Sequence, residues 1–170
     1  MKISAQEEYG VRCLLRLAQT EEQSLTLPEI AQAEGLSVAY VAKLMAVLRQ
    51  AGLIDSVRGR SGGYRLVRAP AQIGLGSLLL ILGEPLYDEQ DYCQKHAGIA
   101  EDGRCVHKGA CSLRTLWQTL EHWMRGTLDQ VTLADLLTNE GQLTDLLRAR
   151  LAATMFKESP NLTPLTTVSV

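Results

Sequence analysis

Three of the four cysteines of the chain, Cys93, Cys105 and Cys111, lie in one short stretch with His96 and His107. The stretch, CQKHAGIAEDGRCVHKGAC, is rich in glycine and charge and lacks the apolar periodicity of a packed helix or strand. Thiolates and imidazoles bind soft metals, and thiols also exchange with disulfides. A metal site, a disulfide and a chance cluster are therefore the three interpretations that this stretch allows.

The amino-terminal residues argue against a secretory signal. Glu7, Glu8 and Arg12 interrupt the apolar stretch there, and no run in the chain approaches the roughly 18 apolar residues of a membrane span. We therefore expect a cytoplasmic protein with no membrane partner. Stable disulfides are rare in that compartment, so a cysteine cluster there favours metal binding or redox sensing.

Charge is unevenly distributed along the 170 residues. The net charge is −2, but the segment 37–68 has six basic residues and one acidic residue, so it carries +5 and the remainder carries −7. A compact basic segment in an acidic chain indicates a polyanionic partner such as nucleic acid. A solvated basic surface is the alternative.

The sequence before and within this basic segment predicts a helix-turn-helix. Thr26 opens a capping box at the start of one helix, Gly35 ends that helix, and Ser37 can cap the next. Ala31, Gly35 and Val41 occupy the small, turn and buried positions that such a motif requires.

The segment LIDSVRGRSGGYRLVRAP then predicts a β-hairpin with arginines around its tip. Directly after a helix-turn-helix, such a hairpin is a wing that contacts phosphates or the minor groove, with a solubilising hairpin as the alternative. We expect base contacts from the start of the third helix and backbone or minor-groove contacts from the wing. The residues predicted to contact DNA are Ser37, Val38, Ala39, Tyr40, Lys43, Arg58, Arg60 and Ser61.

Apolar residues recur every three to four positions from Leu113 to Val131, which predicts a long amphipathic helix. A core helix of one monomer is one interpretation. A homodimer interface is favoured, because a small winged-helix protein has little else for this helix to pack on. The fold class is mainly α with a small β-hairpin wing. The expected organisation is a winged helix-turn-helix at 1–70, a connecting helix at 71–85, a cysteine loop at 86–111, the dimerisation helix and C-terminal helices at 112–152, and a flexible tail at 153–170.

Three stretches resemble the winged-helix regulators typified by IscR, NsrR and RirA, the Rrf2 family. They are MKISAQEEYGVRCLLRLA, LPEIAQAEGLSVAYVAKLMAVLRQAGLIDSVRGRSGGYRLVRAP and LWQTLEHWMRGTLDQVTLADLL, with SVRGRSGGYRL the most specific part. The resemblance runs from residue 1 to 137. It implies a homodimer with a long crossed dimerisation helix that recognises a partly palindromic operator in double-stranded DNA. Many members hold an iron–sulfur cluster in a cysteine loop just before that helix, where Cys93, Cys105 and Cys111 lie.

The spacing of the cysteines departs in part from the family pattern. The gap between Cys105 and Cys111 fits, but the gap between Cys93 and Cys105 is longer than usual, and Arg114 stands where IscR-like members have a histidine ligand. An iron–sulfur cluster needs about four protein donors, so a further ligand must come from elsewhere.

The resemblance implies Glu8 of the other subunit as the fourth ligand, because related members place a carboxylate at the matching position of the first helix. His107 and His96 are alternatives within the loop, and Arg12 stands where one subtype has a histidine ligand. A surface role for Glu8 in the first turn of a helix is also consistent with the sequence. Cys13, on the apolar side of the first helix, is expected to be a core residue.

The predicted function is a homodimeric, DNA-binding transcriptional regulator that senses redox, nitric oxide or iron–sulfur status through this cluster. A 2Fe-2S cluster is favoured over 4Fe-4S. A cluster-free thiol–disulfide switch is the alternative, and zinc is disfavoured because neither cysteine gap matches structural zinc spacing. The chain has no Walker loop, dinucleotide fingerprint or nucleophile elbow, so we expect no enzyme. A redox adaptor or metallochaperone that does not bind DNA is disfavoured by the basic segment.

Overall fold

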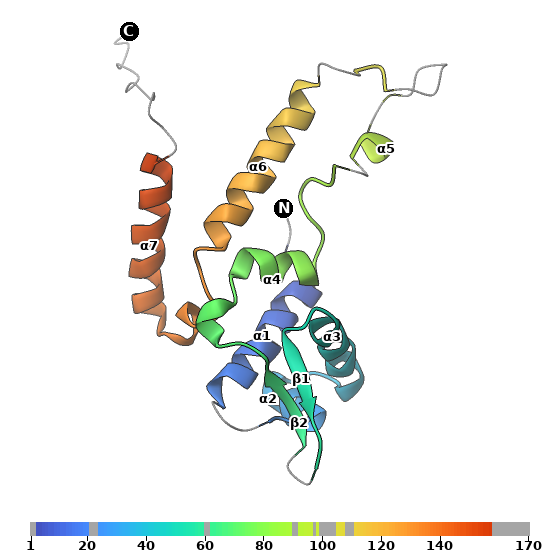
Figure 1. Ribbon diagram of the computed structural model, residues 1–170, viewed down its shortest axis with the longest axis vertical. Helices are drawn as coiled ribbons and strands as arrows, with labels where there is room; N and C mark the ends of the chain where they lie inside the picture. Colours follow the sequence, from blue (N-terminus) through green and yellow to red (C-terminus); the bar gives the residue numbers. More distant parts are fainter. Residues whose placement is uncertain are drawn as a thin grey trace. The chain divides into compact units, whose positions relative to one another are not determined.

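The structure is a computed structural model that describes residues 3–20, 24–59, 62–89, 92–96, 98, 105–107 and 111–157, with only the backbone at His96 and 151–157. The chain divides into two compact units, 1–137 and 138–170 (Figure 1). The first unit contains a three-helix head, a two-stranded hairpin and a long helix. The predicted class, mainly α with a β-hairpin wing, is confirmed.

The head begins with three short helices whose ends follow the capping residues. They are α1 (Ala5–Gln19), α2 (Leu27–Glu34) and α3 (Val38–Gln50). Thr26 and Glu29 form the predicted capping box of α2, and Gly35 ends α2 in the left-handed region at φ 66°. Ser37 caps α3, so both helix boundaries at the turn were predictable from the sequence.

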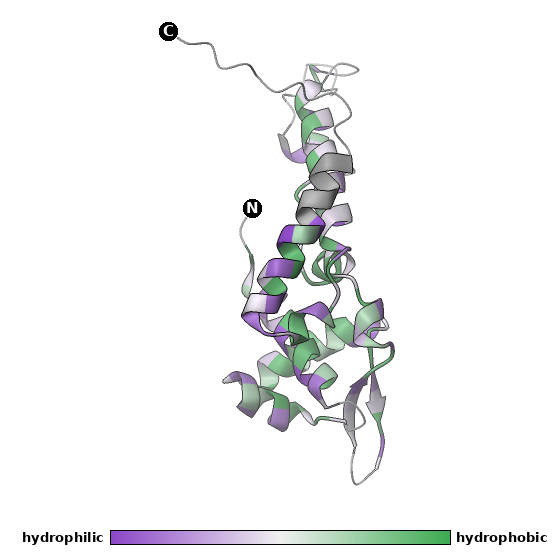
Figure 2. Cartoon of the chain, turned by 90° about the vertical axis from the view of Figure 1, so that its left-hand side faces the viewer, coloured by the Kyte–Doolittle hydropathy of each residue, from purple (hydrophilic) through white to green (hydrophobic). Residues whose placement is uncertain are grey.

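The core of the head lies where the three helices meet. Ala31 and Val41 are buried there, as the helix-turn-helix pattern predicts, and α2 and α3 are bent by 112° at the turn between them. Hydrophobic and hydrophilic residues are interspersed along the helices of the chain (Figure 2), as expected for amphipathic segments. The largest fully buried side chains of the three helices are Leu14, Ile30, Leu44, Met45 and Leu48.

The predicted wing is an antiparallel hairpin of β1 (Ile54–Val57) and β2 (Gly63–Leu66). Leu25, in the connection between α1 and α2, pairs with Tyr64 through two backbone hydrogen bonds of 3.0 and 2.8 Å. Those bonds attach β2 to the head and fix the direction of the hairpin. Arg60 and Ser61, at the predicted tip, lie outside the described residues.

After the wing the chain forms the 3-10 turn η1 (Pro70–Gln72) and α4 (Leu75–Leu82), within the expected connecting segment. The cysteine segment, expected to lack periodicity, contains one short helix, α5 (Tyr92–His96). It is followed by α6 (Ser112–Leu128) and the 3-10 turn η2 (Asp135–Leu137).

Polar side chains along one side of α6 fasten its carboxy-terminal half to α4. Asp129 Oδ1 accepts hydrogen bonds from Ser77 N at 2.7 Å and Ser77 Oγ at 3.0 Å, which caps the start of α4. Arg125 Nη1 donates to Gly76 O at 3.0 Å, and Leu86 N donates to Glu121 Oε2 at 2.8 Å. This half of α6 is therefore continuous with the head, and the compact unit extends to Leu137.

The second unit contains α7 (Glu140–Lys157), where the sequence predicts a further helix. This helix passes the expected start of the tail at 153 and ends at 157. Residues 151–157 contain neither proline nor glycine, so nothing in their sequence ends the helix earlier.

None of the described helices is by itself long and apolar enough to cross a membrane. Taken together, α2 and α3 have the length and apolar composition of a membrane span, but a bend of 112° separates them.

Gly10 of α1 makes a close contact with α4 that can be tested. A Cβ added there would lie 2.5 Å from Leu82 Cδ2, so Gly10→Ala must displace a buried leucine. We expect the free energy of unfolding to fall by about 1–3 kcal/mol, measured by urea denaturation. Gly126→Ala is the control, because the added methyl on α6 would meet no described atom within 4 Å. It should leave the stability equal or up to about 1 kcal/mol higher. A Gly10→Ala protein as stable as the wild type would contradict this contact.

Candidate functional site

One side of α3 faces the core and the opposite side faces solvent. Val38 at its first turn is 46% exposed, Ala39 and Lys43 are exposed, and Tyr40 is half-buried. Ser37 Oγ accepts a hydrogen bond from Tyr40 N at 3.2 Å, which fixes the start of the helix. The predicted contact residues Val38, Ala39 and Lys43 therefore lie on the solvent-exposed side of the first two turns of α3.

The wing adds basic residues beside this helix. Arg58, Arg65 and Arg68 are exposed, and Asp55 is the acidic residue of the same segment. Exposed guanidinium groups of this kind have the charge that contact with phosphate groups requires.

The three clustered cysteines are free thiols and all are half-buried. Cys93 lies in α5, and Cys111 is the N-cap of α6, where its Sγ accepts a hydrogen bond from Arg114 N at 3.4 Å. Within the part of the chain that is described, no three His, Cys, Asp or Glu residues are grouped so as to hold one metal ion. Cys93, Cys105 and Cys111 are therefore not brought together, and His107 is exposed beside Cys105.

Tyr87 is a residue of this region that the sequence did not single out. Its side chain is 7% exposed, and its hydroxyl is buried with no hydrogen-bond partner among the described residues. Its ring lies 5.2 Å from that of Tyr92, the neighbour of Cys93. Burial raises the pKa of Tyr87, and the negative charges of Glu89 and Cys93 also raise this pKa while the charge of Arg114 lowers it. A buried, unpartnered phenol thus lies at the junction between α5 and the first turn of α6.

Glu8 lies in the first half of α1 and forms an ion pair with Arg12. Their atoms Oε1 and Nη2 are 2.7 Å apart, and both side chains are about half exposed. The Arg12 guanidinium lies 5.8 Å from the centre of the Tyr9 ring, and the Tyr9 ring meets that of Tyr40 edge-to-face at 6.1 Å. A continuous series of contacts therefore joins Glu8 to the first turn of α3.

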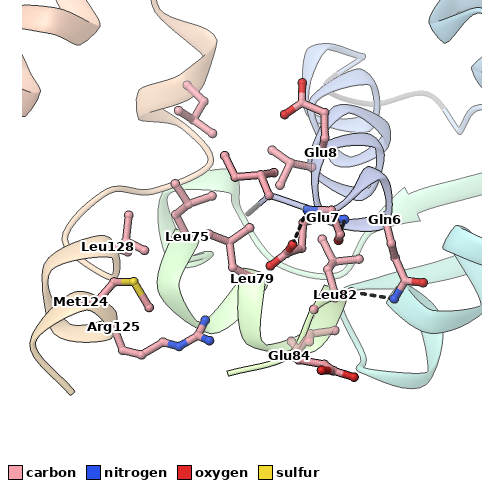
Figure 3. A pocket seen from close by; sticks show the side chains of 16 residues that line it. Gln6, Glu7, Glu8, Leu75, Leu79, Leu82, Glu84, Met124, Arg125 and Leu128 are labelled. Atoms are coloured by element: carbon pink, nitrogen blue, oxygen red, sulfur yellow. Dashed lines mark hydrogen bonds between the residues drawn. The ribbon is translucent and has the colours of Figure 1, made fainter. Parts of the chain in front are cut away.

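Glu8 also lines a pocket of about 690 Å³ between α1, α4 and α6 (Figure 3). The lining is mainly apolar, and Glu7, Glu84 and Arg125 add further charges to it. The apolar side chains come from all three helices and from Ile3 just before α1, and include Val11, Leu75, Leu79, Met124 and Leu128.

Helix α6 has an apolar stripe that the described residues leave exposed. We define the α6 stripe as Leu113, Leu116, Leu120 and Trp123, which are between 36% and 58% exposed. Within α6 only Thr127 is buried.

The sequence profile of the Rrf2 family, described as an iron-dependent transcriptional regulator, matches residues 3–139. The chain belongs to the Rrf2 family. That assignment confirms the predicted family and function class, a transcriptional regulator, and agrees with the expectation of no enzyme.

Relatives in the family cover most of this chain. Protein rrf2 of Nitratidesulfovibrio vulgaris is 36% identical over 142 residues, which are 81% of this chain and 87% of that protein. The structure of T. potens IscR has a TM-score of 0.61 and 33% identity, covering 81% of this chain and 86% of the other. The structure of the oxidized form of Staphylococcus aureus CymR has a TM-score of 0.58 and 31% identity, and the match covers 82% of this chain and 98% of the other.

Cys13 is distinguished from the other three cysteines by its environment. It is fully buried, as predicted, and burial raises its pKa to about 11, with a further rise from the charge of Glu34. At pH 8 this thiol is protonated and inaccessible, so it should not react. We expect a thiol reagent to modify three cysteines in the reduced, metal-free native protein and four after unfolding. In the Cys13→Ala protein, the reagent should modify three cysteines both before and after unfolding. A fourth thiol that reacts as fast as the others in the native protein would contradict this environment.

Proposed function

We propose that this Rrf2-family regulator is a homodimer that binds a partly palindromic operator and senses its signal through an iron–sulfur cluster. Cys93, Cys105 and Cys111 would hold the cluster, and Glu8 of the other subunit would complete it. The observation that carries the sensing proposal is the set of three free, half-buried thiols in the segment that leads into α6. The predicted domain boundaries and DNA contacts are part of the same proposal.

Operator binding is supported by the arrangement of α3 and the wing. The exposed first turns of α3 can enter a major groove while the arginines of the hairpin reach the neighbouring backbone or minor groove. Each head reads one half-site, so a dimer reads two half-sites about one helical turn apart.

Dimer formation is supported by the α6 stripe. Four large apolar side chains on one side of a helix are costly to leave in water, and each gains about 1.5–3 kcal/mol when fully buried. A second copy of the same helix offers a matching apolar surface, and homo-oligomers with two-fold symmetry reuse one surface in this way.

The pocket supports a contribution of Glu8 to the site of the other subunit. Its apolar lining can receive the α6 stripe of a second copy. Cys111 caps the amino-terminal end of that helix, so docking of the helix would bring a cysteine of one subunit towards Glu8 of the other. The Glu8 carboxylate is about half exposed, and it can bind a metal once it releases the Arg12 guanidinium.

The donor set fits the cluster in its chemistry. Three thiolates and one carboxylate supply the four soft and hard donors that an iron–sulfur cluster accepts. The buried hydroxyl of Tyr87 is a hydrogen-bond donor with no partner among the described residues, next to the helix of Cys93, and donors of this kind stabilise negatively charged sulfur. When bound, the cluster would supply a centre that reacts with oxidants or nitric oxide.

The contacts of α1 supply a way to pass the signal to DNA. Any change in what the Glu8 carboxylate binds alters its pairing with Arg12, and Arg12 lies against Tyr9. Tyr9 in turn packs against Tyr40 at the start of α3. The angle between the two heads, and so the match to both half-sites, would then depend on the sensing site.

A cluster-free thiol–disulfide switch is a second candidate. It is favoured by the state of the thiols, which are free and half-buried and are not grouped as ligands among the described residues. A relative, S. aureus CymR, has a structure described as its oxidized form.

Anaerobic purification with iron and sulfide counts and an absorption spectrum separates the two candidates. We expect the wild-type protein to contain both elements. Replacing Cys93, Cys105 or Cys111 by alanine should lower the affinity for iron at least about tenfold, because each supplies a ligand. Cys13→Ala is the matched control and should keep its iron, since Cys13 is a core residue. A colourless, iron-free wild-type protein that binds its operator and responds to peroxide would refute the cluster and favour the thiol switch.

The dimer interface can be tested on the α6 stripe. Trp123→Glu places a charge on it and should weaken dimerisation at least about thirtyfold, as for an interface hot spot. Sedimentation velocity over a concentration series measures this change. Gln118→Glu adds the same charge at an exposed position on the opposite side of α6 and should leave the dimer intact. Equal dimerisation of both variants would show that the stripe is not the interface.

A further inference from the structure

The exposed side of α3 is almost purely aliphatic in the turns that would enter the major groove. Val38 is 46% exposed, Ala39 and Ala46 are exposed, and Ala42 is half-buried between them. The buried residues of the helix, which include Val41 and Leu44, lie on the other side, so this composition is not dictated by the core of the head.

The usual side chains for reading base edges by hydrogen bonding are nearly absent there. Residues 37–46, SVAYVAKLMA, contain no Arg, Asn, Gln, Asp or Glu. Ser37 Oγ already accepts a hydrogen bond from Tyr40 N as the helix cap, and Lys43 is the exposed cation of these turns. A bidentate amide contact to adenine and a carboxylate contact to cytosine cannot be formed by these residues.

The major groove offers one apolar group to such a surface. Thymine carries a C5 methyl there beside its O4 acceptor, whereas the other three bases present hydrogen-bonding groups and no methyl. Small side chains also let the helix backbone approach the base edges closely, so a methyl group can be enclosed between neighbouring aliphatic side chains.

We propose that α3 selects its half-site mainly through thymine methyl groups, which contact Val38 and Ala39 at its first turn. The inference rests on operator binding through the winged helix-turn-helix and adds the chemical class of base that is read. Lys43 supplies a single polar contact to a guanine edge or a phosphate, and the wing supplies contacts that do not depend on sequence.

Replacement of thymine by deoxyuridine tests this directly, because the pairing with adenine is kept and only the methyl is lost. The probe is a duplex selected by the purified full-length protein from a random-sequence pool. Each thymine of that duplex is then replaced in turn and the affinity measured at fixed salt. We expect a loss of about fourfold for each methyl that α3 encloses, from the transfer free energy of one methyl-sized group.

A protein variant links the effect to the helix. Val38→Ala should reduce the thymine-to-deoxyuridine affinity ratio towards one at the affected position. Val67→Ala, at an exposed valine after β2, is the matched control and should keep the ratio.

Two outcomes would overturn the proposal, and they are distinguishable. If the protein binds the selected duplex but deoxyuridine has no effect at any position, α3 does not read methyl groups, although the operator-binding function stands. If no duplex of any sequence is bound, the DNA-binding function fails as well.

Discussion

The apolar stripe of α6 is the constraint on which the other features depend. Leu116, Leu120 and Trp123 are exposed on a helix whose carboxy-terminal end is fastened to α4 by Asp129 and Arg125. The helix can therefore not fold back to cover its own stripe without breaking that attachment. In the proposed dimer, association with a second copy would remove this surface from water and would place the cysteine segment, which leads into the same helix, next to another subunit.

The attachment of α6 also joins the head to the start of the cysteine segment. Glu121 holds the backbone of Leu86, the residue at which the cysteine segment begins, while Arg125 and Asp129 hold α4. On the other side of α4, Leu82 packs closely on Gly10 of α1. A rearrangement of the segment can thus reach α1, and through Tyr9 and Tyr40 the recognition helix, by packed contacts alone.

The sequence predicted most of the head, because its boundaries are set by local capping. Thr26, Gly35 and Ser37 each act within one helical turn, and the small and buried positions of the turn follow from periodicity. Long-range partners were not predictable. The side chain that caps α4 is Asp129, more than fifty residues away, and no local sequence pattern indicates it. Tyr87 was missed for the same reason, since its burial depends on tertiary packing. The proposed ligand set combines Cys93, Cys105 and Cys111 with a residue of a second subunit, which no local pattern within one chain specifies.

The most direct test of the central claim, a sensing site shared between subunits, is the iron content of hybrid dimers. Glu8→Gln and Cys111→Ala each damage both sites of a homodimer, so both homodimers should bind little iron. In a hybrid of the two variants, one site receives Glu8 from one chain and all three cysteines from the other. The account predicts that the hybrid regains about half of the wild-type iron and sulfide, one of two sites being intact. A hybrid as iron-poor as the two homodimers, beside an iron-loaded wild type, would contradict it.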